Sequence, residues 1–164
     1  MHHLYIFDLE GTLFRSEFVN DSEPFSWDSW KVLERPFPDT AETLALLRDA
    51  GNAICIATNA SGVHTRELLA SHGVLGLFDA VVGREDVRNG KPDPEMLEMC
   101  MGLTGYAPGD TVFIGDSPSD MRAAASAGTR FLLIDREGST EPPYGERIRT
   151  LAEAVGYDFE DPRN

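Results

Sequence analysis

A short apolar run that ends in two acidic residues constrains the fold of this chain more than any other feature. Leu4–Phe7 is followed by Asp8, Glu10 and Gly11. Four consecutive apolar residues ahead of a turn signal predict a buried strand. Ligands of open α/β sheets bind at the carboxyl ends of the strands. Asp8 and Glu10 are therefore candidates for a nucleophile and a proton carrier at that edge.

Helical and strand patterns alternate along the rest of the chain. Asp39 is the expected N-cap of the first helix, and Gly51 follows its end. Repeated β-α-β units predict an α/β fold with a parallel sheet and right-handed crossovers. The chain after Gly156 is expected to be polar and loosely held. Strands are expected at 4–8, 53–58, 80–82, 111–115 and 131–134, and helices at 40–50, 63–72, 94–101, 119–127 and 146–155.

Four fragments in a fixed order carry a family resemblance. They are IFDLEGTLF at 6–14, a strand ending in Thr58-Asn59, GKPDP at 90–94 and VFIGDSPSD at 112–120. Together they resemble the four motifs of the haloacid dehalogenase (HAD) superfamily of phosphotransferases and hydrolases. The resemblance extends from about residue 4 to residue 134. It implies a Rossmann-like three-layer sandwich with a mostly parallel sheet.

The resemblance also implies a role for each motif residue. Asp8 would attack phosphorus and form an aspartyl-phosphate, while Glu10 would protonate the leaving oxygen and then activate water. Thr58 would donate its hydroxyl to a phosphoryl oxygen, or it merely caps its strand. Asn59 would orient the substrate. Lys91, held between a glycine and prolines, would place a fixed positive charge beside Asp8, although a lone loop lysine is more often solvated.

Magnesium is the implied cofactor, because a divalent cation reduces the repulsion between a carboxylate nucleophile and a phosphate. The implied ligands are the Asp8 carboxylate, the backbone carbonyl of Glu10, and Asp116. Asp120 would be a further ligand or an acid that orients the others. All of these ligands are oxygens, which suits Mg²⁺. The alternative for Asp116 and Asp120 is an acidic pair at a helix N-terminus.

Glu10 departs from the family pattern, because most phosphatases of this superfamily carry aspartate at its position. A magnesium-dependent phosphate monoester hydrolase acting on a small phosphorylated metabolite remains the favoured interpretation. The first alternative is a catalytically impaired HAD-like protein with a binding or regulatory role. The others are a phosphatase of nucleic-acid ends or nucleotides, and a sugar-phosphate mutase, which usually needs a cap that excludes water.

Residues 14–38 fit no β-α unit, and we expect a single domain, 1–164, with this segment as a flap or minimal cap after the first strand. The segment can hold a β-flap and one small helix, with Ser26 as N-cap and Trp27, Trp30 and Leu33 on one side. The two tryptophans either anchor the insert to the core or line a substrate slot. The second interpretation makes Trp27 and Trp30 candidate substrate-binding residues.

Composition limits the partners and the location. A net charge of −14 disfavours a nucleic-acid partner, since it repels polyanions. No apolar run approaches the roughly 20 residues that cross a bilayer, and no export-signal pattern opens the sequence. Cys55 and Cys100 lack zinc-site spacing and are expected to be buried free thiols, which predicts the cytoplasm. The oligomeric state is left open.

Overall fold

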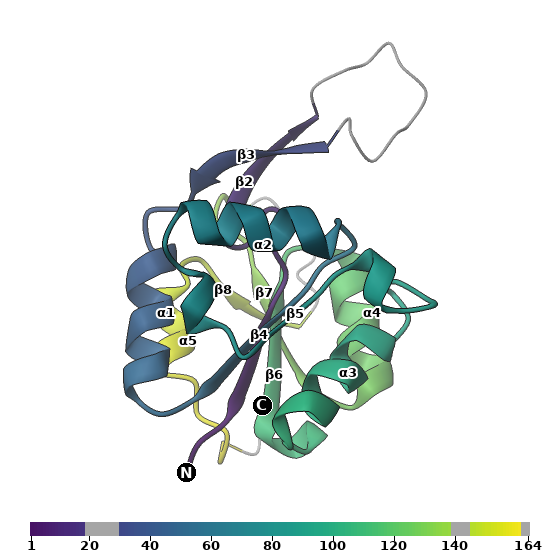
Figure 1. Ribbon diagram of the computed structural model, residues 1–164. Helices are drawn as coiled ribbons and strands as arrows, with labels where there is room; N and C mark the ends of the chain where they lie inside the picture. The colour runs from purple at the N-terminus through teal and green to yellow at the C-terminus, as the bar shows by residue number, and fades with distance from the viewer. Residues whose placement is uncertain (19–29, 139–144, 162–164) are drawn as a thin grey trace.

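A six-stranded sheet forms the centre of the molecule (Figure 1). The computed structural model describes residues 1–18, 30–138 and 145–161. The strands of this sheet are β1 (Leu4–Phe7), β4 (Ala53–Ala57), β5 (Ala80–Val82), β6 (Thr111–Gly115), β7 (Arg130–Ile134) and β8 (Glu146–Ile148). Their order is β5-β4-β1-β6-β7-β8, and every neighbouring pair is parallel. The strands therefore end at one common edge.

Helices cover both faces of this sheet, which confirms the predicted Rossmann-like three-layer α/β sandwich. The α-helices are α1 (Thr40–Asp49), α2 (Gly62–Ser71), α3 (Glu95–Thr104), α4 (Pro118–Ala127) and α5 (Ala152–Val155). Short 3-10 helices are η2 (Leu75–Leu77), η3 (Arg84–Asp86) and η4 (Pro108–Asp110). The apolar cluster on one face includes residues of α1, α2 and α5, and the cluster on the other face includes residues of α3 and α4.

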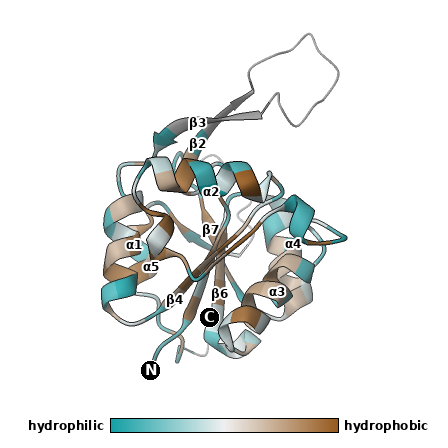
Figure 2. Cartoon of the chain, in the orientation of Figure 1, coloured by the Kyte–Doolittle hydropathy of each residue, from teal (hydrophilic) through white to brown (hydrophobic). Residues whose placement is uncertain are grey.

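The first strand is apolar along its whole length because both of its faces are covered. Tyr5 and Phe7 belong to one apolar cluster, and Leu4 and Ile6 belong to the other. This alternation follows the two-residue period of a strand. Figure 2 shows the central strands as a hydrophobic layer between helices whose outer sides are more hydrophilic. A strand with no solvated face keeps Asp8, the residue after it, at a well-defined position.

The insert forms a two-stranded antiparallel sheet, β2 (Phe14–Phe18) with β3 (Trp30–Pro36), that projects from the core in Figure 1. The expected flap is therefore present, but the helix through Trp30 and Leu33 is wrong. Pairing with β2, in which Phe18 lies opposite Trp30, outweighs the local helical spacing. Ser26 and Trp27 lie outside the described residues. The division into one domain with an insert at 14–38 stays a prediction.

Both ends of the insert are fastened to each other where they leave the core. The backbone N–H of Phe37 and the hydroxyl of Thr40 both donate to the carbonyl of Leu13, at 3.0 and 2.7 Å. Phe14 lies opposite Pro36 in the register of the hairpin. The chain therefore enters and leaves the flap at adjacent points.

Arg136, just after β7, locks this junction to the sheet. Its guanidinium donates to both carboxylate oxygens of Asp39, at 3.0 and 3.1 Å, and to the carbonyl of Thr12 at 3.0 Å. It also lies 3.8 Å from the centre of the Phe37 ring. Asp39 occupies the predicted N-cap position, but its carboxylate binds Arg136 and the backbone N–H of Leu151 instead of capping α1. Partial burial would raise the pKa of Asp39, but these hydrogen bonds outweigh burial and lower it.

The C-terminal part differs most from the sequence prediction. Residues 146–155 do not form one helix, because β8 takes 146–148 and α5 is confined to 152–155. Ile148 is paired with Ile134 and is buried against the core, so long-range pairing overrides the helical pattern. The described part of the tail, residues 157–161, is not loosely held either. Phe159 is buried and its ring stacks on that of His3 at 3.7 Å.

Cys55 and Cys100 are free and buried, as predicted. Cys55 lies on β4, and Cys100 lies on α3, where its thiol faces the carbonyl of Ile56 at 3.8 Å. Among the described residues, no helix combines the length and the apolar character needed to cross a membrane.

Candidate active site

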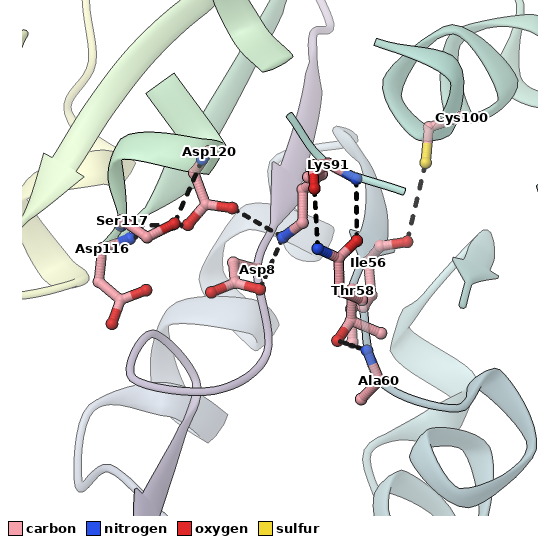
Figure 3. A network of polar contacts seen from close by, with 10 residues as sticks. Asp8, Ile56, Thr58, Ala60, Lys91, Cys100, Asp116, Ser117 and Asp120 are labelled. Atoms are coloured by element: carbon pink, nitrogen blue, oxygen red, sulfur yellow. Dashed lines mark hydrogen bonds and ion pairs between the residues drawn. The ribbon is translucent and has the colours of Figure 1, made fainter. Parts of the chain in front are cut away.

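Three adjacent strands deliver the motif residues to one edge of the sheet. Asp8 follows β1, Thr58 follows β4 and Asp116 follows β6, and these strands are neighbours in the order β4-β1-β6. Lys91 reaches the same place from the loop that precedes α3. Figure 3 shows its side chain between Thr58 on one side and Asp8 and Asp120 on the other.

Lys91 forms a buried bridge between two carboxylates. Its ammonium nitrogen Nζ lies 2.8 Å from Oδ1 of Asp8 and 2.7 Å from Oδ1 of Asp120. The Lys91 side chain is 4% exposed, so solvent screens these ion pairs little. Burial by itself would lower the pKa of Lys91, but the charges of Asp8 and Asp120 outweigh burial and raise it. Lys91 is therefore a permanent positive charge in this site.

Asp120 is held from its other side by the start of α4. Its Oδ2 accepts the backbone N–H groups of Asp116 and Ser117, both at 3.2 Å. The Ser117 hydroxyl accepts the backbone N–H of Asp120 in return, also at 3.2 Å, which completes a capping box. Any side chain at Gly115 would collide with the Asp120 carboxylate. Asp120 is thus fixed before any ligand binds.

Asp8, Asp116 and Asp120 form a cluster that can hold a metal ion. One oxygen from each of the three carboxylates lies within 4.8 Å of the others. Burial raises the pKa of Asp8 well above its ordinary value, and the charges of Asp120, Asp116 and Glu10 add to this effect against the opposing charge of Lys91. The excess of negative charge makes a divalent cation a suitable addition to this site.

Gly11 allows the turn after Asp8 to approach Asp116 closely. Its φ of 75° lies in the left-handed region, and a Cβ there would overlap the Asp116 carboxylate. Glu10, in the same turn, is half-buried. Burial raises the pKa of Glu10, and Asp116 and Asp120 add to the rise while Lys91 opposes it. A carboxyl group with a raised pKa can carry a proton nearer to neutral pH.

The Thr58 hydroxyl is oriented by its own strand end. It is buried and accepts the backbone N–H of Ala60 at 3.0 Å. A hydroxyl has one hydrogen to donate in addition to its acceptor sites, so this bond leaves the hydrogen available for a ligand oxygen.

Asn59, one of the predicted substrate-binding residues, has contacts other than those expected. The side-chain amide of Asn59 binds the backbone of Lys91 through two hydrogen bonds. Trp30 starts β3, and Trp27 lies outside the described residues. Contacts of either tryptophan with a substrate therefore stay a prediction. The sequence interpretation missed Ser117, although its Ser-x-x-Asp spacing to Asp120 is a capping-box pattern.

Residues 29–134 match the model of a protein family described as haloacid dehalogenase-like hydrolase. A phosphoglycolate phosphatase of Salmonella paratyphi A is 37% identical over 122 residues, which are 74% of this chain and 47% of that protein. The chain thus spans about half the length of the curated relatives it matches.

Solved structures agree with this match. A HAD phosphatase from Thermococcus onnurineus superposes with a TM-score of 0.69 at 34% identity, covering 78% of this chain and 58% of that one. A HAD-superfamily hydrolase from Ehrlichia chaffeensis gives a TM-score of 0.75 at 18% identity and covers 94% of this chain and 96% of that one, which shows a shared fold.

Proposed function

The chain belongs to the haloacid dehalogenase-like hydrolase family, and from this premise we propose that it hydrolyses small phosphate monoesters through an aspartyl-phosphate on Asp8. The observation that carries the proposal is the buried Asp8–Lys91–Asp120 bridge, with Asp116 beside it. It joins a carboxylate nucleophile to a fixed cation at the ligand-binding edge of the sheet. The names of the phosphoglycolate phosphatase relatives support the same reaction class.

In the first step, a carboxylate oxygen of Asp8 attacks phosphorus and the bond between phosphorus and the ester oxygen breaks. Protonated Glu10 gives its proton to the departing oxygen, so the alcohol leaves neutral. In the second step, Glu10 takes a proton from water as that water attacks the phosphorus of the aspartyl-phosphate. The bond to Asp8 then breaks, which releases phosphate and restores both carboxyl groups.

Thr58 and Lys91 stabilise the phosphoryl group in both steps. The hydroxyl of Thr58 donates to one phosphoryl oxygen, and the Lys91 ammonium balances the negative charge that reaches the site. Both groups are held before the substrate arrives, by Ala60 in one case and by two carboxylates in the other. Preorganised donors in a buried site are worth more than the same donors in water.

The residues present fit Mg²⁺, because the converging side chains offer only carboxylate oxygens. We propose Asp8, Asp116 and the backbone carbonyl of Glu10 as its ligands. The bonds that already hold Asp120 support an orienting role for it over that of a direct ligand. When bound, the ion reduces the repulsion between Asp8 and the substrate phosphate.

Stabilisation by Mg²⁺ should increase with pH. The folded-state pKa values of Asp8 and Glu10 are raised, so each group favours folding below its unfolded pKa, about 4. That contribution is lost as pH rises through the folded value. Mg²⁺ needs deprotonated ligands. It therefore binds most tightly at the higher pH values, where the metal-free carboxyl groups contribute least to the stability of the fold.

Melting temperatures with and without Mg²⁺ from pH 5.5 to 8 test this expectation. At 100 times the dissociation constant, the gain should be about 2.7 kcal/mol at the upper end of the range and should shrink toward the lower end. Asp116→Asn should remove most of the gain, whereas Asp79→Asn, at the opposite edge of the sheet, should retain it. A gain that does not change with pH would argue against these ligands.

Glu10 should act as the acid and base. Glu10→Gln keeps the shape of the side chain but cannot transfer the proton, so kcat should fall by about 10²-fold or more. Glu10→Asp should keep measurable activity. Stopped assays of phosphate release from one phosphate ester give kcat for both variants and for the wild type. Unchanged turnover in Glu10→Gln would exclude the role, and a silent wild type with an active Glu10→Asp variant would indicate an impaired enzyme.

A panel of phosphorylated metabolites with Mg²⁺ tests the function as a whole. Phosphoglycolate is the first ester to assay, because relatives are named for it. Two free buried thiols support a cytoplasmic reaction. If no ester in the panel releases more phosphate than a control that contains a metal chelator, the phosphatase proposal is rejected.

A further inference from the structure

We propose that Asn59 is a positioning residue that acts through Lys91 and not on the substrate. This inference rests on the proposed function, since it concerns how the cation of that site is held. It also replaces the sequence-based expectation that Asn59 orients the substrate.

The Asn59 side chain grips the backbone of one residue at two points. Its Nδ2 donates to the carbonyl oxygen of Lys91 at 3.0 Å, and its Oδ1 accepts the backbone N–H of Lys91 at 2.9 Å. This pairing resembles one rung of a strand ladder, made by an amide side chain in place of a second strand. These two bonds fix the orientation of the amide toward the Lys91 backbone, although the amide keeps one N–H hydrogen and one lone pair.

The neighbouring glycine shows how closely the two segments approach. A Cβ at Gly90 would lie 2.6 Å from Oδ1 of Asn59, so any side chain there would have to displace the Asn59 amide. The sequence places glycine directly before the lysine, so the loop can come against the Asn59 amide. The two segments are 32 residues apart in the chain.

Holding the root of Lys91 matters because its side chain is long. Lysine loses much rotamer freedom when it is fixed, and a mobile root would add further positions for the ammonium group. The bonds from Nζ to Asp8 and Asp120 require one position. A displacement of about 1 Å in a catalytic group can cost about 10²-fold in rate.

Asn59 also links two groups of the site. It directly follows Thr58, whose hydroxyl is available for a phosphoryl oxygen. The end of β4 therefore positions the Thr58 hydroxyl through the backbone that follows it. It positions the Lys91 ammonium through the Asn59 amide. One strand end determines the distance between them.

Asn59→Leu removes both hydrogen bonds at similar side-chain volume, and the chain offers a matched control. Asn52 makes the same kind of clamp at the opposite edge of the sheet, where it accepts the backbone N–H of His3 at 3.0 Å and donates to the carbonyl of Leu47 at 3.2 Å. Both variants should lower the melting temperature. Only Asn59→Leu should lower kcat, by about 10²-fold, and Asn52→Leu should leave kcat and KM within about twofold of wild type.

A double-mutant cycle with Lys91→Met separates positioning from direct substrate contact. If Asn59 acts through Lys91, adding Asn59→Leu to Lys91→Met should change kcat/KM by less than about twofold. If the double variant instead loses kcat/KM by the product of the two separate effects, the proposal is overturned and Asn59 acts on the substrate directly.

A readout without turnover keeps this test distinct from the proposed function. The chain has two lysines, Lys31 and Lys91, so labelling by an amine-reactive ester can be followed for each by mass spectrometry. Relative to Lys31, labelling of Lys91 should rise severalfold in Asn59→Leu and stay unchanged in Asn52→Leu. Unchanged labelling in both variants would reject the positioning role even if the enzyme is active. Increased labelling in an inactive protein would support the positioning role while the phosphatase proposal fails.

Discussion

Asp8→Asn should abolish turnover and leave the metal-free protein at least as stable as the wild type. Loss of a catalytic nucleophile lowers kcat on the order of 10⁴-fold or more. Replacing a buried residue usually lowers the free energy of unfolding, but we expect no such loss in Asp8→Asn. The Asn carbonyl can still accept from the Lys91 ammonium, and the repulsion between Asp8 and the acids beside it disappears.

The sign of the stability change follows from the raised pKa of Asp8. A carboxyl with a folded-state pKa above its unfolded value lowers the stability of the fold increasingly as the pH rises above the unfolded value, about 4. Urea unfolding of metal-free protein at pH 7.5 should therefore give Asp8→Asn the same midpoint as wild type or a higher one. Asp79→Asn is the control, because it removes a carboxylate that binds Arg48 and the N–H of Ile54, far from the site. Wild-type turnover in Asp8→Asn would refute the aspartyl-phosphate mechanism.

Lys91→Met should be the most destabilising single substitution in the site. It leaves the Asp8 and Asp120 carboxylates buried without their shared cation. Breaking a buried ion pair in this way costs about 3–5 kcal/mol. Arg48→Met is the contrasting control, since the Arg48–Asp79 pair is 41% and 30% exposed and such pairs contribute up to about 1 kcal/mol.

The loss of stability in Lys91→Met should depend on pH and on Mg²⁺. Without Lys91, the pKa of Asp8 loses the influence that lowers it, so the carboxyl takes up a proton more readily. Denaturant midpoints should therefore approach those of wild type as pH falls from 8 to 5.5, and Mg²⁺ should recover part of the deficit at pH 8. An equal deficit at both pH values would show that packing, and not charge, accounts for the loss.

Patterns contained within one segment were predictable from the sequence. The apolar runs before Asp8, Thr58 and Asp116 become β1, β4 and β6, because strands buried on both faces need continuous apolar residues. The same order along the chain predicts that these residues lie at one sheet edge, as they do. The two acids beside the Lys91 ammonium belong to the motifs already identified in the sequence.

Features that depend on distant partners were not predictable in this way. Glu146–Ile148 forms β8 because Ile148 pairs beside Ile134, whereas its own residues also fit a helix. Trp30 lies in β3 because Phe18 is opposite. The amide of Asn59 meets Lys91 only when the loop closes on it. In each case a hydrogen-bonding partner far along the chain decides between locally equivalent structures.

The fastened root of the flap suggests where this molecule tolerates redesign. Leu13 joins Phe37 and Thr40, and Arg136 ties the same junction to the end of β7. A segment inserted between β2 and β3 would thus begin and end at paired strands. Each doubling of the length of such a closed loop costs only about 0.6 kcal/mol. Foreign segments inserted between β2 and β3 should therefore leave the register of the six-stranded sheet unchanged.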